Sequence, residues 1–195
     1  MPLSGFRVER QLEVQILRLQ SDDATNRLTR ECVQTLTAGI GELASKSAPL
    51  IVAGNNRFFS AGADLQEISQ LNGPDAIAFA QMGQRLMAAI DHFPAPVWAA
   101  IDGYCMGGGL DLALACDHRI ASPHAVFGHR GAALGLITGW GGTQRLPRLI
   151  GKGHALEMFV AAEKVTATKA LRIGLIDAIA ADPVGEALRR IHQEH

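Results

Sequence analysis

The sequence predicts an α/β fold, because short apolar stretches alternate with helical patterns along the whole chain. Residues 48–54 (APLIVAG) and 94–103 (PAPVWAAIDG) are largely apolar, which is typical of strands buried on both faces of a sheet. Between them, residues 73–90 favour a long helix. No linker or low-complexity segment interrupts the 195 residues, so we expect one domain over residues 1–195.

In the first half of the chain, residue spacing and proline position indicate the elements. Apolar residues recur at helical spacing within 24–43, and Pro74 suits the first turn of a helix. Residues 6–20 are rich in β-branched residues, and their alternation is broken around Gln11. The elements expected here are two strands within 6–20, a helix within 24–43, the strand 48–54, a loop over 55–68 that becomes helical near Asp64, and a helix over 73–90.

In the second half, capping residues mark one helix clearly. Thr166 is a suitable N-cap, and Gly174 is a suitable stop for the helix that follows it. The elements expected here are the strand 94–103, a helix over 110–115, strands at 118–121 and 125–128, helices over 139–151 and 152–162, a helix over 167–174, a strand at 175–180 and a helix over 183–195.

The composition excludes several classes of function. The formal net charge is −1, which gives no support to a nucleic-acid-binding surface. No apolar run is long enough to cross a bilayer, and the first ten residues lack the apolar core of a signal peptide. The three cysteines have no metal-type spacing and indicate free thiols in a reducing compartment. We therefore expect a cytoplasmic protein with no metal, nucleic-acid or membrane partner.

Two glycine-containing loops are the main functional signal. Residues 60–65 (SAGADL) and 106–112 (MGGGLDL) each follow an apolar strand and precede a helix. Such loops point backbone N–H groups outward at a helix N-terminus, where two of them can hold one developing oxyanion. The alternative is that both loops are tight turns that need small residues for packing. Neither loop matches a dinucleotide-binding or nucleoside-triphosphate-binding pattern.

At these loops the chain resembles a known family. The stretches FFSAGADLQEI, PVWAAIDGYCMGGGLDLALACDHRIAS, FGHRGAALGLITGWGGTQRLPRLIGKGHALEMFV and ATKALRIGLIDAI are similar to the enoyl-CoA hydratase/isomerase (crotonase) family. The resemblance is collinear from Phe6 to Ile179. It implies the Clp protease/crotonase fold of repeated ββα units, an acyl-CoA substrate with coenzyme A and no further cofactor, a role in fatty acid metabolism, and a homotrimer or hexamer.

The resemblance also assigns roles to residues. It implies that the backbone N–H groups of Ala63 and Gly108 hold the thioester oxygen and that coenzyme A lies along residues 60–65. Arg57 is a candidate for the coenzyme A phosphates, or an ordinary solvated charge. The implied substrate-binding residues are Ala61, Gly62, Asp64, Gly107, Arg130, Gly131 and Trp140.

The chain departs from the family at the acids. A family hydratase uses two glutamates to hold a water and to divide the acid and base work. The first position is Asp111 here, and the second is Gly131, which has no side chain. Simple hydration is therefore expected to be slow or absent, whereas chemistry with one acid remains open. Asp111 has a second possible role as the cap of its helix, and Gly139 stands where a dehalogenase of the family has its aspartate.

Each of the three residues His129, Arg130 and Trp140 has two possible roles. His129 and Arg130 flank the missing acid. Arg130 is suited to holding a substrate carboxylate or to facing solvent, and His129 to reaching the site or to capping a strand end. Trp140 either shortens the acyl pocket or packs in the core. The chain also ends sooner after GLIDAIA than the family pattern, so the C-terminal helical part is expected to be short or missing.

The leading hypothesis is an enzyme of this family, a lyase or isomerase, in which Ala63 and Gly108 stabilise an enolate and Asp111 is the sole acid/base. The nearest alternative is a decarboxylase of malonyl-type thioesters or another single-acid lyase. An alternative from another class is a non-catalytic acyl-CoA-binding or oligomer subunit. A serine hydrolase has weak support, because Ser60 and Ser122 lie in no nucleophile-elbow pattern.

Overall fold

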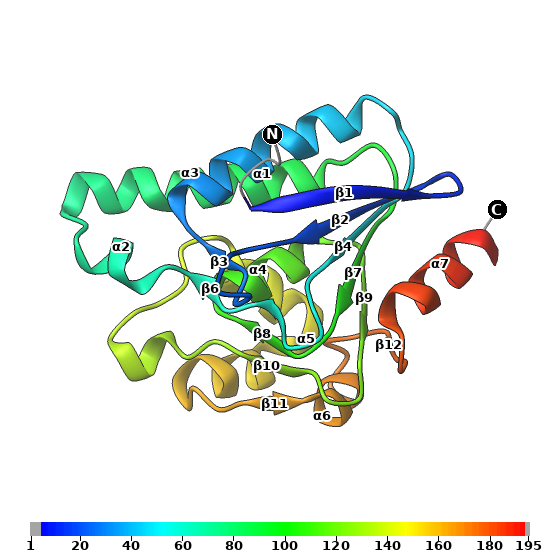
Figure 1. Cartoon of the computed structure of the whole chain (residues 1–195). Coiled ribbons are helices and arrows are strands. Elements are labelled where there is room, and N and C mark those ends of the chain that lie inside the picture. The colour runs from blue at the N-terminus through cyan, green and yellow to red at the C-terminus, as the bar shows by residue number, and fades with distance from the viewer. Residues whose placement is uncertain (1–4, 194–195) are drawn as a thin grey trace.

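The computed structural model describes residues 5–193 and contains two main sheets (Figure 1). The larger sheet has six strands in the order β1-β2-β4-β7-β9-β12. Its β1 and β2 form an antiparallel hairpin, and every later pairing in this sheet is parallel. The six strands are β1 (Phe6–Gln11), β2 (Val14–Leu19), β4 (Leu50–Ala53), β7 (Val97–Ile101), β9 (His118–Ala121) and β12 (Ala178–Ile179).

The second sheet has four strands in the order β11-β10-β8-β5, and two further strands, β3 and β6, pair with each other. The strand pairs β4/β5, β7/β8 and β9/β10 each place the first strand in the six-stranded sheet and the second in the four-stranded sheet, and a helix follows. This arrangement confirms the expected ββα units. The strands are β3 (Arg27–Leu28), β5 (Phe58–Ser60), β6 (Gly62–Ala63), β8 (Tyr104–Met106), β10 (Val126–Gly128) and β11 (Val165–Thr166).

Helices cover both faces of the six-stranded sheet. In Figure 1, α1 and α3 run along one side and α7 packs on the other. The alternation of β7 explains both layers, because Val97 and Ile101 face the first side and Trp98 faces α7. The helices are α1 (Arg30–Ala44), α2 (Leu65–Ser69), α3 (Gly73–Asp91), α4 (Gly108–Ala115), the short 3₁₀ helix η1 (Gly131–Leu134), α5 (Gly142–Val160), α6 (Ala167–Arg172) and α7 (Pro183–Gln193).

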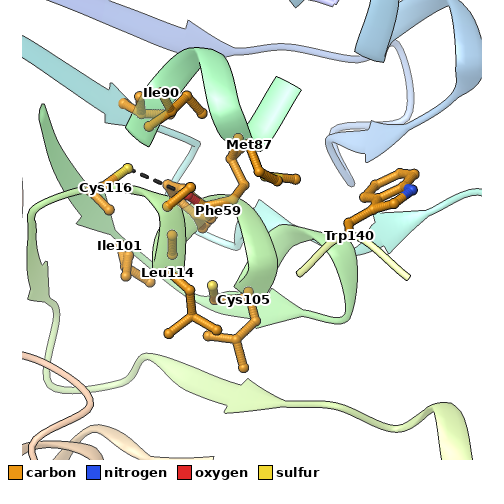
Figure 2. Packing of buried hydrophobic residues seen from close by; sticks show 14 of the residues in the cluster. Phe59, Met87, Ile90, Ile101, Cys105, Leu114, Cys116 and Trp140 are labelled. Carbon is orange, nitrogen blue, oxygen red and sulfur yellow. Dashed lines mark hydrogen bonds between the residues drawn. The ribbon is translucent and has the colours of Figure 1, made fainter. Parts of the chain in front are cut away.

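Helix α4 lies in the centre of the molecule, and all eight of its residues are buried. Figure 2 shows Met87 and Ile90 of α3, Ile101 of β7 and Leu114 of α4 packed in one apolar cluster. A helix that is apolar all round is typical of a fully buried position. Its first residues are therefore held rigidly by the surrounding core.

Several element boundaries differ from the sequence expectation. The helix expected within 24–43 begins only at Arg30, because Thr29 is extended and its hydroxyl accepts a hydrogen bond from the Cys32 N–H. The stretch 55–68 contains β5 and β6 before α2. The two helices expected over 139–162 form α5, which is interrupted at Gly151 by a positive φ of 81°. The last helix is described to Gln193, and residues 194–195 of that expectation lie outside the described residues.

Candidate active site

The two glycine loops meet in the structure. A Cβ built on Gly108 would lie 3.3 Å from the backbone nitrogen of Ala63, and a Cβ on Gly62 would lie 3.0 Å from the nitrogen of Gly108. Gly62 and Gly107 also have positive φ values, 91° and 52°. The end of β6 and the start of α4 therefore approach so closely that packing favours glycine at positions 62 and 108, whereas at position 107 the positive φ favours it.

The helix start leaves the backbone N–H of Gly108 available at this contact. Gly108 is the first residue of α4, so no carbonyl of its own helix can accept its N–H. The Gly107 N–H donates to the Gly128 carbonyl over 2.9 Å and ties the loop to β10. Partial positive charge gathers at such a helix start. This geometry suits a partly negative oxygen beside Ala63 and Gly108.

Asp111 lies one turn further along α4 and is almost wholly buried, with 1% of its surface exposed. The Thr138 hydroxyl donates a hydrogen bond to its Oδ2. Its Oδ1 lies 3.3 Å from the Nε2 of His129. The alternative role of Asp111 as a helix cap is wrong, because Gly107 is the N-cap and Asp111 stands inside the helix.

His129 directly follows β10 and turns inward, with 4% of its surface exposed. Its ring lies 5.0 Å from the Phe159 ring of α5, so it is held between that helix and Asp111. The neighbouring Arg130 is exposed. Of the two residues that flank the missing acid, only His129 is brought to Asp111.

The position of the second acid carries no side chain and has no room for one in this conformation. A Cβ on Gly131 would lie 2.6 Å from the Leu136 carbonyl oxygen. The Leu136 N–H in turn donates to the Gly131 carbonyl over 2.8 Å. No carboxylate therefore faces Asp111 from this position.

Trp140 is buried and packs against the start of α4. A Cβ on Gly108 would lie 2.5 Å from Cζ3 of the Trp140 ring. The indole N–H donates to the Phe79 carbonyl over 3.2 Å, and the two rings lie 5.2 Å apart. Trp140 is thus a core residue and, at the same time, the wall beside Gly108.

The residues expected along coenzyme A are held by local contacts. Asp64 caps α2 by accepting from the Gln66 and Glu67 N–H groups, and its other oxygen lies 3.3 Å from Arg27. Ala61 is half-buried and donates its N–H to the Thr25 carbonyl. Arg57 is exposed and lies over the Phe58 ring.

A groove of about 880 Å³ lies between α3, α4 and α5. It is lined by Thr138, which binds Asp111, but not by Asp111, Ala63 or Gly108 themselves. Within residues 5–193, no group of three or more His, Cys, Asp or Glu side chains is placed to hold a metal ion. No helix in the same range is long and apolar enough to cross a membrane.

The ββα units and the paired loops define a crotonase-type protein. A family model described as enoyl-CoA hydratase/isomerase matches residues 9–194. The chain therefore belongs to the enoyl-CoA hydratase/isomerase family of enzymes, as its motifs predicted.

Relatives agree with this assignment. The chain is 34% identical to a short-chain-enoyl-CoA hydratase of Clostridium acetobutylicum over 182 residues. The aligned residues make up 92% of this chain and 70% of that protein. It is 46% identical to a probable enoyl-CoA hydratase of Bacillus subtilis over 134 residues. The aligned residues make up 68% of this chain and only 52% of that protein.

Solved structures show the same fold. DspI of Pseudomonas aeruginosa superposes with a TM-score of 0.92 at 35% identity, over 97% of this chain and 74% of that one. An enoyl-CoA hydratase of Bacillus anthracis superposes with a TM-score of 0.90 at 31% identity, over 98% of this chain and 76% of that one. The expected crotonase-like fold is confirmed.

Proposed function

We propose that the chain binds an acyl-CoA thioester and stabilises its enolate between the backbone N–H groups of Ala63 and Gly108, with Asp111 as the sole acid/base. The observation that carries the proposal is the contact of β6 with the start of α4, which sets these two backbone nitrogens side by side. Asp111 follows one helical turn later. Polarising the thioester carbonyl acidifies the α-carbon, and fixed donors then stabilise the enolate oxygen.

The other assigned residues complete the proposed binding site. Ala61, Gly62, Asp64 and Gly107 shape the two loops along which coenzyme A lies, and Trp140 closes the acyl end beside Gly108. Gly131 and the exposed Arg130 stand at its outer edge. Coenzyme A, carried by the substrate, is the only cofactor that this proposal requires. A cytoplasmic homotrimer or hexamer is part of the proposal by family resemblance.

Gly131 favours a second candidate reaction. Hydration by paired acids needs a second carboxylate, and the Leu136 carbonyl occupies the space where a side chain at 131 would begin. Decarboxylation of a malonyl-type thioester needs the oxyanion donors but no second acid, because loss of CO₂ itself leaves the enolate. The names of the hydratase relatives favour the first reaction class, and the missing acid favours single-acid chemistry.

The test is mass spectrometry of crotonyl-CoA incubated with the protein in deuterated water enriched in heavy oxygen. The proposal predicts coenzyme A binding with no uptake of heavy oxygen. Rapid incorporation of heavy oxygen into a 3-hydroxy product would contradict the sole-acid assignment. Malonyl-CoA in the same assay tests decarboxylation by the loss of CO₂.

The variant D111N separates an enzyme from a non-catalytic binder. It replaces the carboxylate by an uncharged group of similar size, so turnover of any accepted substrate is expected to collapse while coenzyme A affinity survives. A protein that binds acyl-CoA without any turnover, before and after this substitution, would be a binding subunit.

A further inference from the structure

Asp111 and His129 form an isolated polar pair inside the core. Both residues are more than nine-tenths buried, and Oδ1 of Asp111 lies 3.3 Å from Nε2 of His129. Among the described residues, neither atom makes a hydrogen bond, and the 3.3 Å contact between the two does not have hydrogen-bond geometry either. Buried polar atoms are usually hydrogen-bonded, so two that face only each other indicate a shared role.

The surroundings fix the pair from three sides. The Thr138 hydroxyl holds Oδ2 of Asp111, so Oδ1 is the oxygen that remains for proton exchange. The Phe159 ring packs against the imidazole of His129, with 5.0 Å between the two ring centroids. Gly142 opens α5 directly beside the pair, and a Cβ there would collide with Oδ1 and lie 3.0 Å from Nε2. The α5 chain is thus shaped around the pair.

The order of these groups excludes a hydrolase of the triad type. In such a site the imidazole bonds to the nucleophilic hydroxyl, whereas here the Thr138 hydroxyl bonds to the carboxylate. Ser60 donates its hydroxyl to the Asn26 carbonyl over 2.7 Å and is also unavailable as a nucleophile in this arrangement. The Nε2 of the imidazole therefore faces the carboxylate and no nucleophilic hydroxyl.

We propose that His129 is a positioning residue that works through Asp111: its unprotonated Nε2 takes over the proton that Asp111 removes from the substrate, and the imidazolium so formed then donates to Oδ1. This inference rests on the proposed function of Asp111. A carboxylate oxygen has two lone pairs, so Oδ1 can face the substrate and the imidazole together.

The proton balance of this step is closed. The α-carbon–hydrogen bond of the thioester breaks, and its electron pair moves into the enolate, whose oxygen is held by the Ala63 and Gly108 N–H groups. The proton bonds first to Asp111 Oδ1 and then to Nε2 of His129. An imidazolium beside a carboxylate results. In deuterated water it exchanges its proton for a solvent deuteron, and the reverse path delivers that deuteron to carbon. No oxidant, reductant or further reactant is needed.

His129 does not replace the missing second acid as a holder of water. Its Nε2 is buried and lies 3.3 Å from Oδ1 of Asp111, a separation too short for a water to fit between the two groups. The pair acts on one proton, which agrees with single-acid chemistry rather than with hydration.

The variants H129Q and H129A test this role in the full chain. Glutamine keeps a polar side chain beside Asp111 but cannot carry the proton. We measure exchange of the α-protons of butyryl-CoA in deuterated water by mass spectrometry. H129Q is expected to lower kcat about 10²-fold with KM changed less than about threefold, and added imidazole is expected to restore part of the rate of H129A.

The matched control is H124Q. His124 forms another histidine–aspartate pair, with Nε2 2.8 Å from Oδ1 of Asp102, but it is exposed and lies outside the proposed site. H124Q is expected to leave both kcat and KM unchanged. Equal losses in H124Q and H129Q would overturn the inference, because the effect would then be general.

The outcomes separate the two proposals. If the wild type exchanges and D111N does not, but H129Q keeps the wild-type kcat, the inference about His129 is wrong and the proposed function stands. If the wild type shows no exchange, or if D111N exchanges as fast as the wild type, the proposed function fails and the role of His129 fails with it.

A spectroscopic readout tests the pair without activity. The ¹⁵N chemical shift of the His129 Nε2 reports whether that nitrogen carries a proton. D111N is expected to change this shift, and D102N is expected to leave it unchanged. An Nε2 signal that does not respond to D111N would contradict the contact on which the inference depends.

Discussion

The carboxylate of Asp111 lies directly against the backbone of Gly142, the first residue of α5. Helix α4 carries the proposed acid, Asp111, and α5 begins at Gly142, where a side chain would collide with that carboxylate. The contact joins two ββα units that are separate in the sequence. It also makes Gly142 a sensitive position, although glycine there carries no chemistry.

We predict that G142A destabilises the protein by about 1–3 kcal/mol, because the added methyl group overpacks the Asp111–His129 pair. Gly153 in the second part of α5 is the matched control, since a Cβ there meets nothing within 4 Å. G153A is expected to be neutral or to stabilise by up to about 1 kcal/mol. Urea unfolding measures both, and equal effects of the two variants would refute the packing argument.

Trp140 is predicted to limit the length of the acyl chain. Because its ring lies beside Gly108, W140F opens space at the acyl end and is expected to improve kcat/KM for octanoyl-CoA relative to butyryl-CoA by at least about tenfold. It also leaves the Phe79 carbonyl without its indole partner, at a stability cost of about 1–3 kcal/mol.

The control for Trp140 is W98F. Trp98 is equally buried but belongs to the cluster under α7. Its loss is expected to lower stability without changing the chain-length preference. An unchanged preference in W140F would place the acyl end elsewhere.

The three cysteines are predicted to be unreactive in the folded protein. All are buried, and burial raises the pKa of the thiols to about 11 for Cys32 and about 12 for Cys116, and well above the ordinary value for Cys105. Since the thiolate is the reactive form, iodoacetamide at pH 8 should label none of them before unfolding and all three in denaturant. Rapid labelling of the folded chain would show that the core around α4 opens.

Glu186 is predicted to contribute to stability only above acid pH. Hydrogen bonds from Arg189 and then Arg190 lower its pKa from 4.5 to about 2. A carboxyl group with a lowered folded-state pKa stabilises the fold above its unfolded pKa, and this stability is lost as the pH falls from about 5 towards 2. The Tm difference between the wild type and E186Q should therefore shrink over this range. A constant difference would mean that the ion pair contributes nothing, as for many exposed pairs.

The sequence predicted α3 and β7 well, because both carry clear apolar patterns, and Thr166 caps α6 as expected. It missed β6, β8 and β11, because strands of two or three residues are too short to show an alternation. Strand β5, which leads into β6, pairs with β8 and so brings the two glycine loops near each other. The family resemblance was needed to pair Ala63 with Gly108.

The contact of Asp111 with His129 could not be predicted from the sequence, for a different reason. The two residues lie on separate ββα units, and only tertiary packing sets their orientation. The sequence did place His129 beside the missing acid, and it left two roles possible for this residue, reaching the site or capping a strand end. The contact favours reaching the site over capping a strand end. The signal that could have found the contact is the buried histidine that directly follows an apolar strand.

The most direct test of Asp111 as the base is exchange of the α-protons of butyryl-CoA in deuterated water, followed by mass spectrometry, with the wild type and D111N side by side. We expect deuterium at the α-carbon with the wild type and a loss of about 10²-fold or more in the exchange rate with D111N, while both proteins bind coenzyme A. Exchange that is absent in the wild type, or equally fast in D111N, would contradict the assignment of Asp111 as the base that forms the enolate.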